Sequence, residues 1–134
     1  MIKKIVVIWM CCIFTLLSII AVSTDESQGN FINGPSTSIT ILCPEPGNVY
    51  LWSRPVFPLS INRTIIVGPI VVEAGVTGFN GFEVDFYIDG EHKSHDISWP
   101  FEYSWVEPGL GTYLITAELT GYDLTDSIKV FKIL

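Results

Sequence analysis

The sequence has 134 residues, a length that suits one domain and leaves no room for two cores once an export segment is removed. Its aromatic and β-branched residues, punctuated by Gly and Pro, favour strands over surface helices. The net charge is −7 and residues 1–23 carry only Lys3 and Lys4, so the remainder carries −7 − 2 = −9. This charge argues against nucleic acid as a partner, because phosphate binding needs a basic surface.

The amino terminus has the pattern of an export segment. Two lysines precede an uncharged run from Ile5 to Val22, after which polar residues begin. Ala21 to Ser23 offers a small-x-small cleavage site, whereas about 18 residues cover roughly 27 Å of a hydrocarbon core of roughly 30 Å. We therefore predict a signal peptide or signal anchor over 1–23, with residues 1–22 in the membrane if it is uncleaved. Both alternatives place the rest outside the cytoplasm, membrane-anchored or secreted.

The cysteines exclude an internal disulfide in the exported part. Cys11 and Cys12 lie inside the apolar run, which leaves Cys43 alone beyond it. One thiol cannot build a metal cage, and no partner for a cysteine nucleophile is evident. We expect a small buried side chain at the end of a strand.

A polar tether over 24–35 leads into the predicted strands. Ser36 to Leu42 alternates, and the prolines that follow Cys43 end the strand. Asn48 to Ser60 starts as an extended segment with Tyr50 and Trp52 on one side, and it continues into a Pro-rich stretch that cannot be a central strand. We interpret it as an edge excursion.

The middle of the chain has the most regular patterns. Thr64 to Val67 and Ile70 to Val76 are β-branched runs separated by Gly68-Pro69. Val84 to Ile88 alternates and ends at Asp89-Gly90, a dipeptide that suits a tight hairpin with a returning strand to Asp96.

Three alternating segments follow, over 101–105, 113–119 and 126–134. In the last one, Phe131 and Ile133 lie on the face opposite Ile128 and Val130, which indicates a bulge or a more covered edge. The same two apolar residues raise the alternative of an open edge over 129–134 that pairs with another copy. No useful helix is expected after Val22. Short strands with a turn about every ten residues predict one all-β antiparallel sandwich over 36–134.

Three stretches carry a resemblance to a known family. Val84-Asp85-Phe86-Tyr87-Ile88-Asp89-Gly90, then Trp99-Pro100-Phe101-Glu102-Tyr103, then Gly111-Thr112-Tyr113-Leu114-Ile115-Thr116-Ala117 resemble the immunoglobulin-like (Big-type) domains of bacterial and archaeal surface and secreted proteins. The resemblance covers about half of the chain. It implies an immunoglobulin-like fold and a cell-surface or secreted accessory module, and it implies no particular ligand.

Three features of that fold map onto single residues. Tyr113 fits the tyrosine corner, in which a Tyr near the start of the sixth strand bonds back to the preceding turn. The antibody pattern would place Cys two residues later, where this chain has Ile115, so an apolar core must replace the disulfide. Phe86 would stand in for the core tryptophan of strand C.

We expect no enzyme, no metal site and no cofactor. His92 and His95 are three residues apart, a spacing that puts side chains on opposite faces of a regular strand. Acidic residues surround the same hairpin without the spacing of a calcium loop. The sequence also contains no Gly-x-Ser-x-Gly elbow, no Cys-His pairing and no phosphate-binding glycine loop.

The candidate contact residues are aromatics on loops and edges: Tyr50, Trp52, Phe79 and Trp99. They either bind a ligand or cover the open ends of the sandwich. Asn62 begins an Asn-x-Thr acceptor sequence for N-glycosylation.

The leading functional hypothesis is an exported, non-catalytic module for adhesion or protein interaction at the cell surface. The alternatives are a carbohydrate-binding module, which requires Trp52 and Trp99 to be exposed, and a structural envelope or spacer component. The expected partner is accordingly a protein or polysaccharide at the cell surface.

Overall fold

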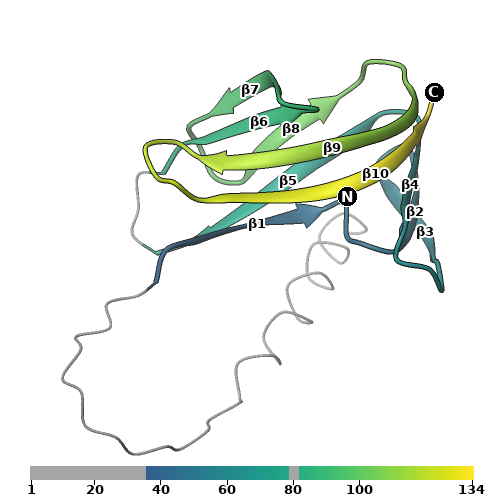
Figure 1. Cartoon of the computed structure of the whole chain (residues 1–134), viewed down its shortest axis with the longest axis horizontal. Coiled ribbons are helices and arrows are strands. Elements are labelled where there is room, and N and C mark those ends of the chain that lie inside the picture. Colours follow the sequence, from purple (N-terminus) through teal and green to yellow (C-terminus); the bar gives the residue numbers. More distant parts are fainter. Residues whose placement is uncertain (1–35, 79–81) are drawn as a thin grey trace, which may run out of the picture. The chain divides into compact units, whose positions relative to one another are not determined.

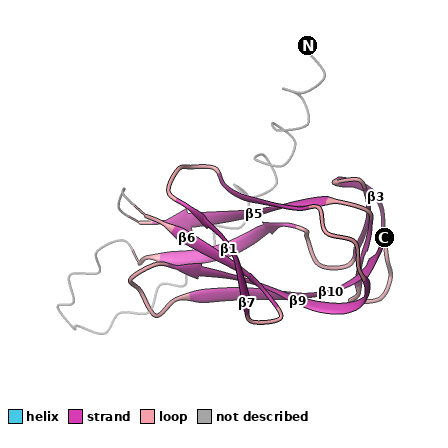
Figure 2. Cartoon of the chain, turned by 90° about the horizontal axis from the view of Figure 1, so that it is seen from above, coloured by secondary structure: helices cyan, strands magenta, loops and turns pink. Residues whose placement is uncertain are grey.

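The computed structural model describes residues 36–78 and 82–134, and all regular structure in that part of the chain is β-strand (Figure 2). The strands are β1 (Ser38–Cys43), β2 (Asn48–Leu51), β3 (Arg54–Pro58), β4 (Thr64–Val67), β5 (Ile70–Thr77), β6 (Val84–Ile88), β7 (Glu91–Asp96), β8 (Phe101–Trp105), β9 (Leu110–Leu119) and β10 (Thr125–Ile133). The predicted signal or anchor over 1–23 and the tether over 24–35 lie outside the described residues. Within those residues no helix has the length and apolar character needed to cross a bilayer.

The strands form two sheets, which confirms the all-β, two-sheet prediction. One sheet has the order β1-β5-β8, and the other has the order β3-β2-β4-β10-β9-β6-β7. The prediction of a purely antiparallel sandwich is wrong, because β4 pairs in parallel with both β10 and β2. Neither parallel pair joins strands that follow each other in the sequence, so no hairpin turn marks them.

Alternating burial explains why these segments form strands. In β6 and β8 every second side chain is buried, as the period of two requires for a strand with one face on the core. Phe86 is fully buried on β6, in the place where the resemblance expects a core tryptophan. Cys43 ends β1 and packs, partly buried, against the same core. A single apolar core between the sheets therefore holds the fold without a disulfide.

The chain changes sheets between β1 and β4. β1 pairs with β5 in the smaller sheet, whereas β4 pairs with β10 in the larger one. The β2–β3 hairpin lies in the segment that connects the two sheets, between β1 and β4. Figure 1 shows β2, β3 and β4 together at the end of the molecule where β10 ends. β3 is the outermost strand of its sheet, which agrees with the predicted edge excursion.

The predicted open edge at β10 is wrong. β10 lies between β9 and β4, so its backbone is paired on both sides. Phe131 and Ile133 point away from the core because Val130 and Lys132 point into it. Their apolar character therefore needs a different explanation, which the neighbouring strands supply below.

Lys132 is a buried cation at the same end of the sandwich. Its Nζ donates a hydrogen bond to the Gly68 carbonyl at 2.7 Å and lies 4.7 Å from the centre of the Trp105 ring. Burial lowers the pKa of Lys132, and attraction to the Glu107 carboxylate opposes the shift. The cation thus joins the β4–β5 turn to β8, and its charged form is less favourable than in water.

The wild type should gain stability relative to the variant Lys132→Met as the pH becomes alkaline. Because the pKa is lowered by folding, the unfolded chain binds more protons than the folded chain between the folded-state pKa and about 10.4. The free energy of unfolding of the wild type relative to Lys132→Met should therefore rise with pH across that window and stay constant below it.

Urea denaturation of both proteins from pH 7 to pH 10 measures this difference. Burial raises the pKa of Tyr50 and of Tyr103, but both tyrosines are present in both proteins, so their effect cancels. If the difference in free energy of unfolding between the two proteins does not change with pH, the lowered pKa of Lys132 is wrong.

Candidate binding surface

Tyr50 belongs to the core and not to a contact surface. Its side chain is 3% exposed, and its Oη accepts a hydrogen bond of 2.8 Å from the backbone N–H of Glu45. Burial also raises the pKa of Tyr50. The sequence interpretation placed Tyr50 and Trp52 on one side of an extended segment, but β2 ends at Leu51 and Trp52 lies in the following turn. Of this pair, only Trp52 is presented to solvent.

Trp52 and Trp99 are both exposed, at 60% and 77%, but they do not form one platform. The Trp52 ring lies against Gly68, just before the start of β5. Trp99 precedes Phe101, which pairs with Ala74 well along β5. The two indoles therefore lie towards opposite ends of the sandwich. Phe79 is outside the described residues.

The turn that presents Trp52 has a strained backbone. Trp52 and Ser53 have φ values of 46° and 62°, and Leu51 pairs with Arg54 across the turn. A two-residue hairpin turn with both central φ values positive usually contains Asn and Gly, because other side chains are strained there. No local sequence signal predicts this turn, since neither residue is typical of it.

The β4–β5 connection holds the strained turn in place. The Trp52 N–H donates to the Val67 carbonyl at 3.1 Å, and the Val71 N–H donates to Ser53 Oγ at 3.0 Å. The strain is therefore imposed by the surrounding structure.

β3 is exposed on both of its faces. All five of its residues are exposed, including Val56 at 53% and Phe57 at 52%. Phe57 pairs with Val49 on the outer face of the sheet, while Pro55 pairs with the buried Tyr50 on the inner face. β3 is thus an apolar ribbon with solvent on either side.

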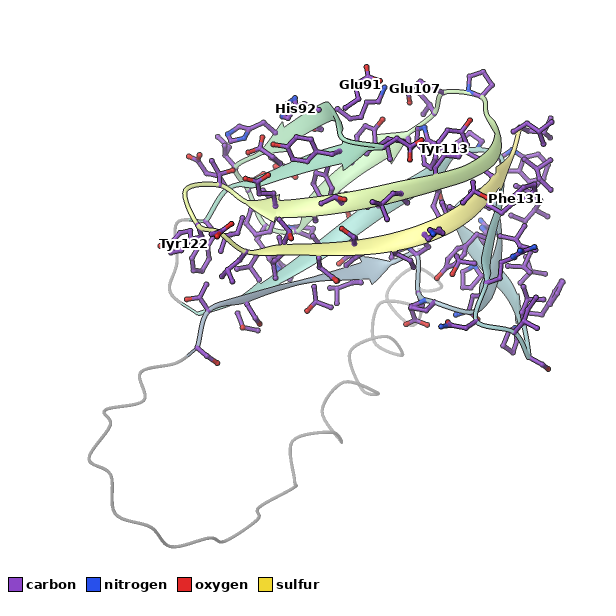
Figure 3. The ribbon with its side chains drawn as sticks, in the orientation of Figure 1. Glu91, His92, Glu107, Tyr113, Tyr122 and Phe131 are labelled. Carbon is purple, nitrogen blue, oxygen red and sulfur yellow. The ribbon has the colours of Figure 1, made fainter. Side chains whose placement is uncertain are left out.

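The outer face of the sheet continues the apolar character of the hairpin. Directly paired residues share a face, and two rows of pairs cross β2, β4, β10 and β9. The rows are Val49, Ile65, Phe131 and Thr112, and Leu51, Val67, Ile133 and Leu110. Figure 3 shows Phe131 at the end of the molecule where β2, β3 and β4 lie. This explains why Phe131 and Ile133 are apolar although β10 is not an edge.

We call this region the hairpin surface and define it by its apolar members: Val49, Leu51, Trp52, Val56, Phe57, Ile65, Val67, Leu110, Phe131 and Ile133. Surface apolar residues are usually scattered, and contiguous patches of them mark contact sites.

The hairpin surface also differs in charge from the rest of the protein. The chain has 14 Asp and Glu against 7 Lys and Arg, yet between Glu45 and Glu73 it has no carboxylate and two arginines, Arg54 and Arg63. The segments of β9 and β10 that belong to the surface also lack Asp and Glu, and Lys129 precedes Phe131. The charged residues within and directly beside these strands are therefore mainly basic, although the Glu45 carboxylate accepts a hydrogen bond from the Asn48 side chain at the start of β2.

The two histidines lie on one face of β7, contrary to the sequence expectation. His92 Nε2 and His95 Nδ1 both lie within hydrogen-bond distance of Asp85 Oδ1, at 2.8 and 2.9 Å. A register shift between β6 and β7 pairs Tyr87 with His92 and Asp85 with His95, which restores a common face at a spacing of three.

Asp85 keeps its charge in this cluster. Burial raises its pKa, but hydrogen bonds from Thr120, His92 and His95 together lower it further. In the part of the chain that the structure describes, no group of three His, Cys, Asp or Glu side chains is arranged to hold a metal ion. His92, His95 and Thr120 therefore form a hydrogen-bond network around the Asp85 carboxylate.

The two remaining predicted residues have clear positions. Asn62 is exposed in the β3–β4 loop, and Thr64 of its acceptor sequence is buried, with its hydroxyl bonded to the Gly47 N–H. Tyr113 is half-buried and packs edge to face on Trp105. A Cβ atom on Gly109 would lie 2.7 Å from the Tyr113 hydroxyl, so the ring reaches back to the preceding turn as a tyrosine corner does.

Comparison with solved structures finds similar chains at low identity. The fibronectin(III)-like modules of Clostridium thermocellum CbhA align with a TM-score of 0.49 and 21% identity over 74% of this chain and 47% of that chain. The endo-β-1,4-mannanase of Thermotoga petrophila gives 0.47 and 14% over 78% and 21%. The CARDB domain of PF1109 from Pyrococcus furiosus, in complex with di-metal ions, gives 0.45 and 13% over 84% and 100%.

No protein-family model matches the chain, and no curated protein matches it either. The chain spans about half of the CbhA modules and about a fifth of the mannanase. The class that the two sheets define is an all-β sandwich module.

Trp52→Asn should maintain the stability of the fold although it removes a large side chain. Asn tolerates positive φ, whereas Trp in that region costs about 1 to 3 kcal/mol. We expect the free energy of unfolding to stay equal or to rise by about 1 kcal/mol in thermal or urea denaturation, with Trp99→Asn as the matched exposed control. A fall of about 2 kcal/mol or more would show that Trp52 is a packing residue.

Proposed function

We propose that this chain is an exported, non-catalytic interaction module that contacts its partner through the hairpin surface. The observation that carries the proposal is β3, whose five residues are all exposed and include Val56 and Phe57. Folding alone does not favour apolar side chains there, because they bury little area against the rest of the chain. Contact with a partner provides the burial that the fold lacks.

The strained turn supports the same proposal. A residue such as Asn at position 52 would relieve the backbone, yet the chain has a tryptophan, the side chain that contributes most at contact sites. Strain that is maintained by neighbouring hydrogen bonds and presents a large aromatic side chain is typical of binding residues. A purely structural spacer would not require this arrangement.

A carbohydrate-binding module is the less favoured alternative. Trp52 and Trp99 are exposed, as that alternative requires, but they lie towards opposite ends of the sandwich. Sugars are commonly held by aromatic rings that lie side by side, so these two indoles would have to act as separate sites.

Chemical modification of tryptophan on intact cells tests the proposal. A membrane-impermeant tryptophan reagent is applied to cells that naturally produce the chain and, separately, to the purified full chain. We expect Trp99 to react in both samples, because it is 77% exposed and on the exported part. Trp52 should react in the purified chain and be protected on cells.

Trp99 serves as the internal control for access. If Trp99 does not react on intact cells, the extracytoplasmic location is wrong. If Trp52 reacts on cells as fast as Trp99, the hairpin surface has no partner there and the proposed function fails.

A further inference from the structure

The hairpin surface has three properties that together restrict which class of partner can cover it. It is apolar on both faces of β3, the charged residue of β3 is the cation Arg54, and this outermost strand has few backbone donors. Each property restricts what can cover it.

Exposure on both faces argues against a flat partner. Phe57 faces outward opposite Val49, and Pro55 faces inward opposite Tyr50, yet both are exposed. A flat protein surface, including the same face of a second copy, would cover one side of β3 and leave the other in water. A medium that surrounds the ribbon covers both sides.

The charge of the surface matches an anionic partner. Arg54, Arg63 and Lys129 are exposed, and no carboxylate lies between Glu45 and Glu73. Each basic residue near an anionic bilayer contributes about 1 kcal/mol, and a second copy of this acidic chain offers no acidic counterpart on the same face. The acidic remainder of the module would be directed away from such a surface.

The backbone of β3 is suited to an environment with little water. An unpaired N–H costs free energy in an apolar medium, and an edge strand usually has a row of them. Pro55 and Pro58 have no N–H, so two of the five residues of β3 contribute no donor. Trp52 at the turn is the kind of side chain that prefers the boundary between lipid tails and headgroups.

We propose that the β2–β3 hairpin inserts into the interface of an anionic lipid bilayer, with Val56 and Phe57 among the acyl chains, Trp52 at the boundary between acyl chains and headgroups, and Arg54 at the phosphates. The inference rests on the proposed function, since it names the partner of the same surface. It does not depend on residues 1–22, which would tether the chain without determining which side of the sandwich faces the lipid.

Quenching of tryptophan fluorescence by brominated lipids tests the orientation in the full chain. The sequence has four tryptophans, at positions 9, 52, 99 and 105. The variant Trp9→Phe/Trp99→Phe retains Trp52, and the matched variant Trp9→Phe/Trp52→Phe retains Trp99. Both retain the buried Trp105 as a common background.

The variants are mixed with phosphatidylglycerol vesicles that contain dibromo-phosphatidylcholine. We expect loss of emission in the variant with Trp52 and none in the variant with Trp99. Adding Arg54→Ser to the Trp52 variant should weaken the quenching titration about five-fold, because one cation leaves the anionic surface.

Equal quenching of the two variants would overturn the inference, since the chain would then reach the lipid without a preferred side. Absence of quenching in both would also overturn it. If Trp52 is protected on cells but is not quenched by lipid, the proposed function stands and the partner is a protein or a polysaccharide. If Trp52 is quenched by vesicles but reacts freely on cells, the proposed function fails although the surface has affinity for lipid.

Discussion

Pairing of β10 on both sides is the constraint on which the rest of this structure depends. β9 supplies one side through a hairpin, and the other side is closed by β4, which runs parallel to β10. Strands that follow each other through a tight hairpin are antiparallel, so the parallel partner of β10 must come from a distant part of the chain. The segment after β1 therefore leaves the smaller sheet and crosses to the larger one.

The β2–β3 hairpin lies where the chain passes from the smaller sheet to the larger one, and this position explains why it is exposed. β2 continues the sheet beyond β4 and contributes Tyr50 to the core, so the hairpin is attached firmly at its base. β3 lies one strand further out, at the edge of the larger sheet, and all five of its residues are exposed. Its apolar side chains are consistent with a contact outside the fold. Lys132 and the Ser53 hydroxyl stabilise the adjoining β4–β5 turn by hydrogen bonds.

Much of the fold could be predicted from the sequence because its signals are local. The alternation in 84–88 and 101–105 and the Asp89-Gly90 turn depend on neighbouring residues, and they give strands close to β6 and β8. The parallel pairs of β4 could not be predicted in this way, since pairing of distant segments leaves no local pattern. The wrong prediction of an open edge at β10 has the same origin. The apolar residues Phe131 and Ile133 suggest an edge strand only as long as the parallel partner β4 is not known.

The candidate site was less accessible to sequence reasoning. Trp52 was selected for its aromatic ring, but the positive φ that makes it unusual is a property of the folded backbone. Tyr50 and Trp52 do not share a face, because β2 ends at Leu51: Tyr50 lies on the core face of the strand and Trp52 lies in the following turn. The histidines were separated by assuming a regular strand, whereas a register shift brings His92 and His95 to one carboxylate. In each case an irregularity of one or two residues changes which face a side chain occupies.

The most direct measurement of the central claim is hydroxyl-radical footprinting of the purified chain in solution, read by mass spectrometry at single residues. We predict that Trp52 and Phe57 are oxidised rapidly, while Tyr50 and Phe86 are protected because they lie in the core. Protection of Trp52 and Phe57 to the level of Tyr50 would contradict it, since the hairpin would then be packed within the fold and no apolar surface would be available for a partner.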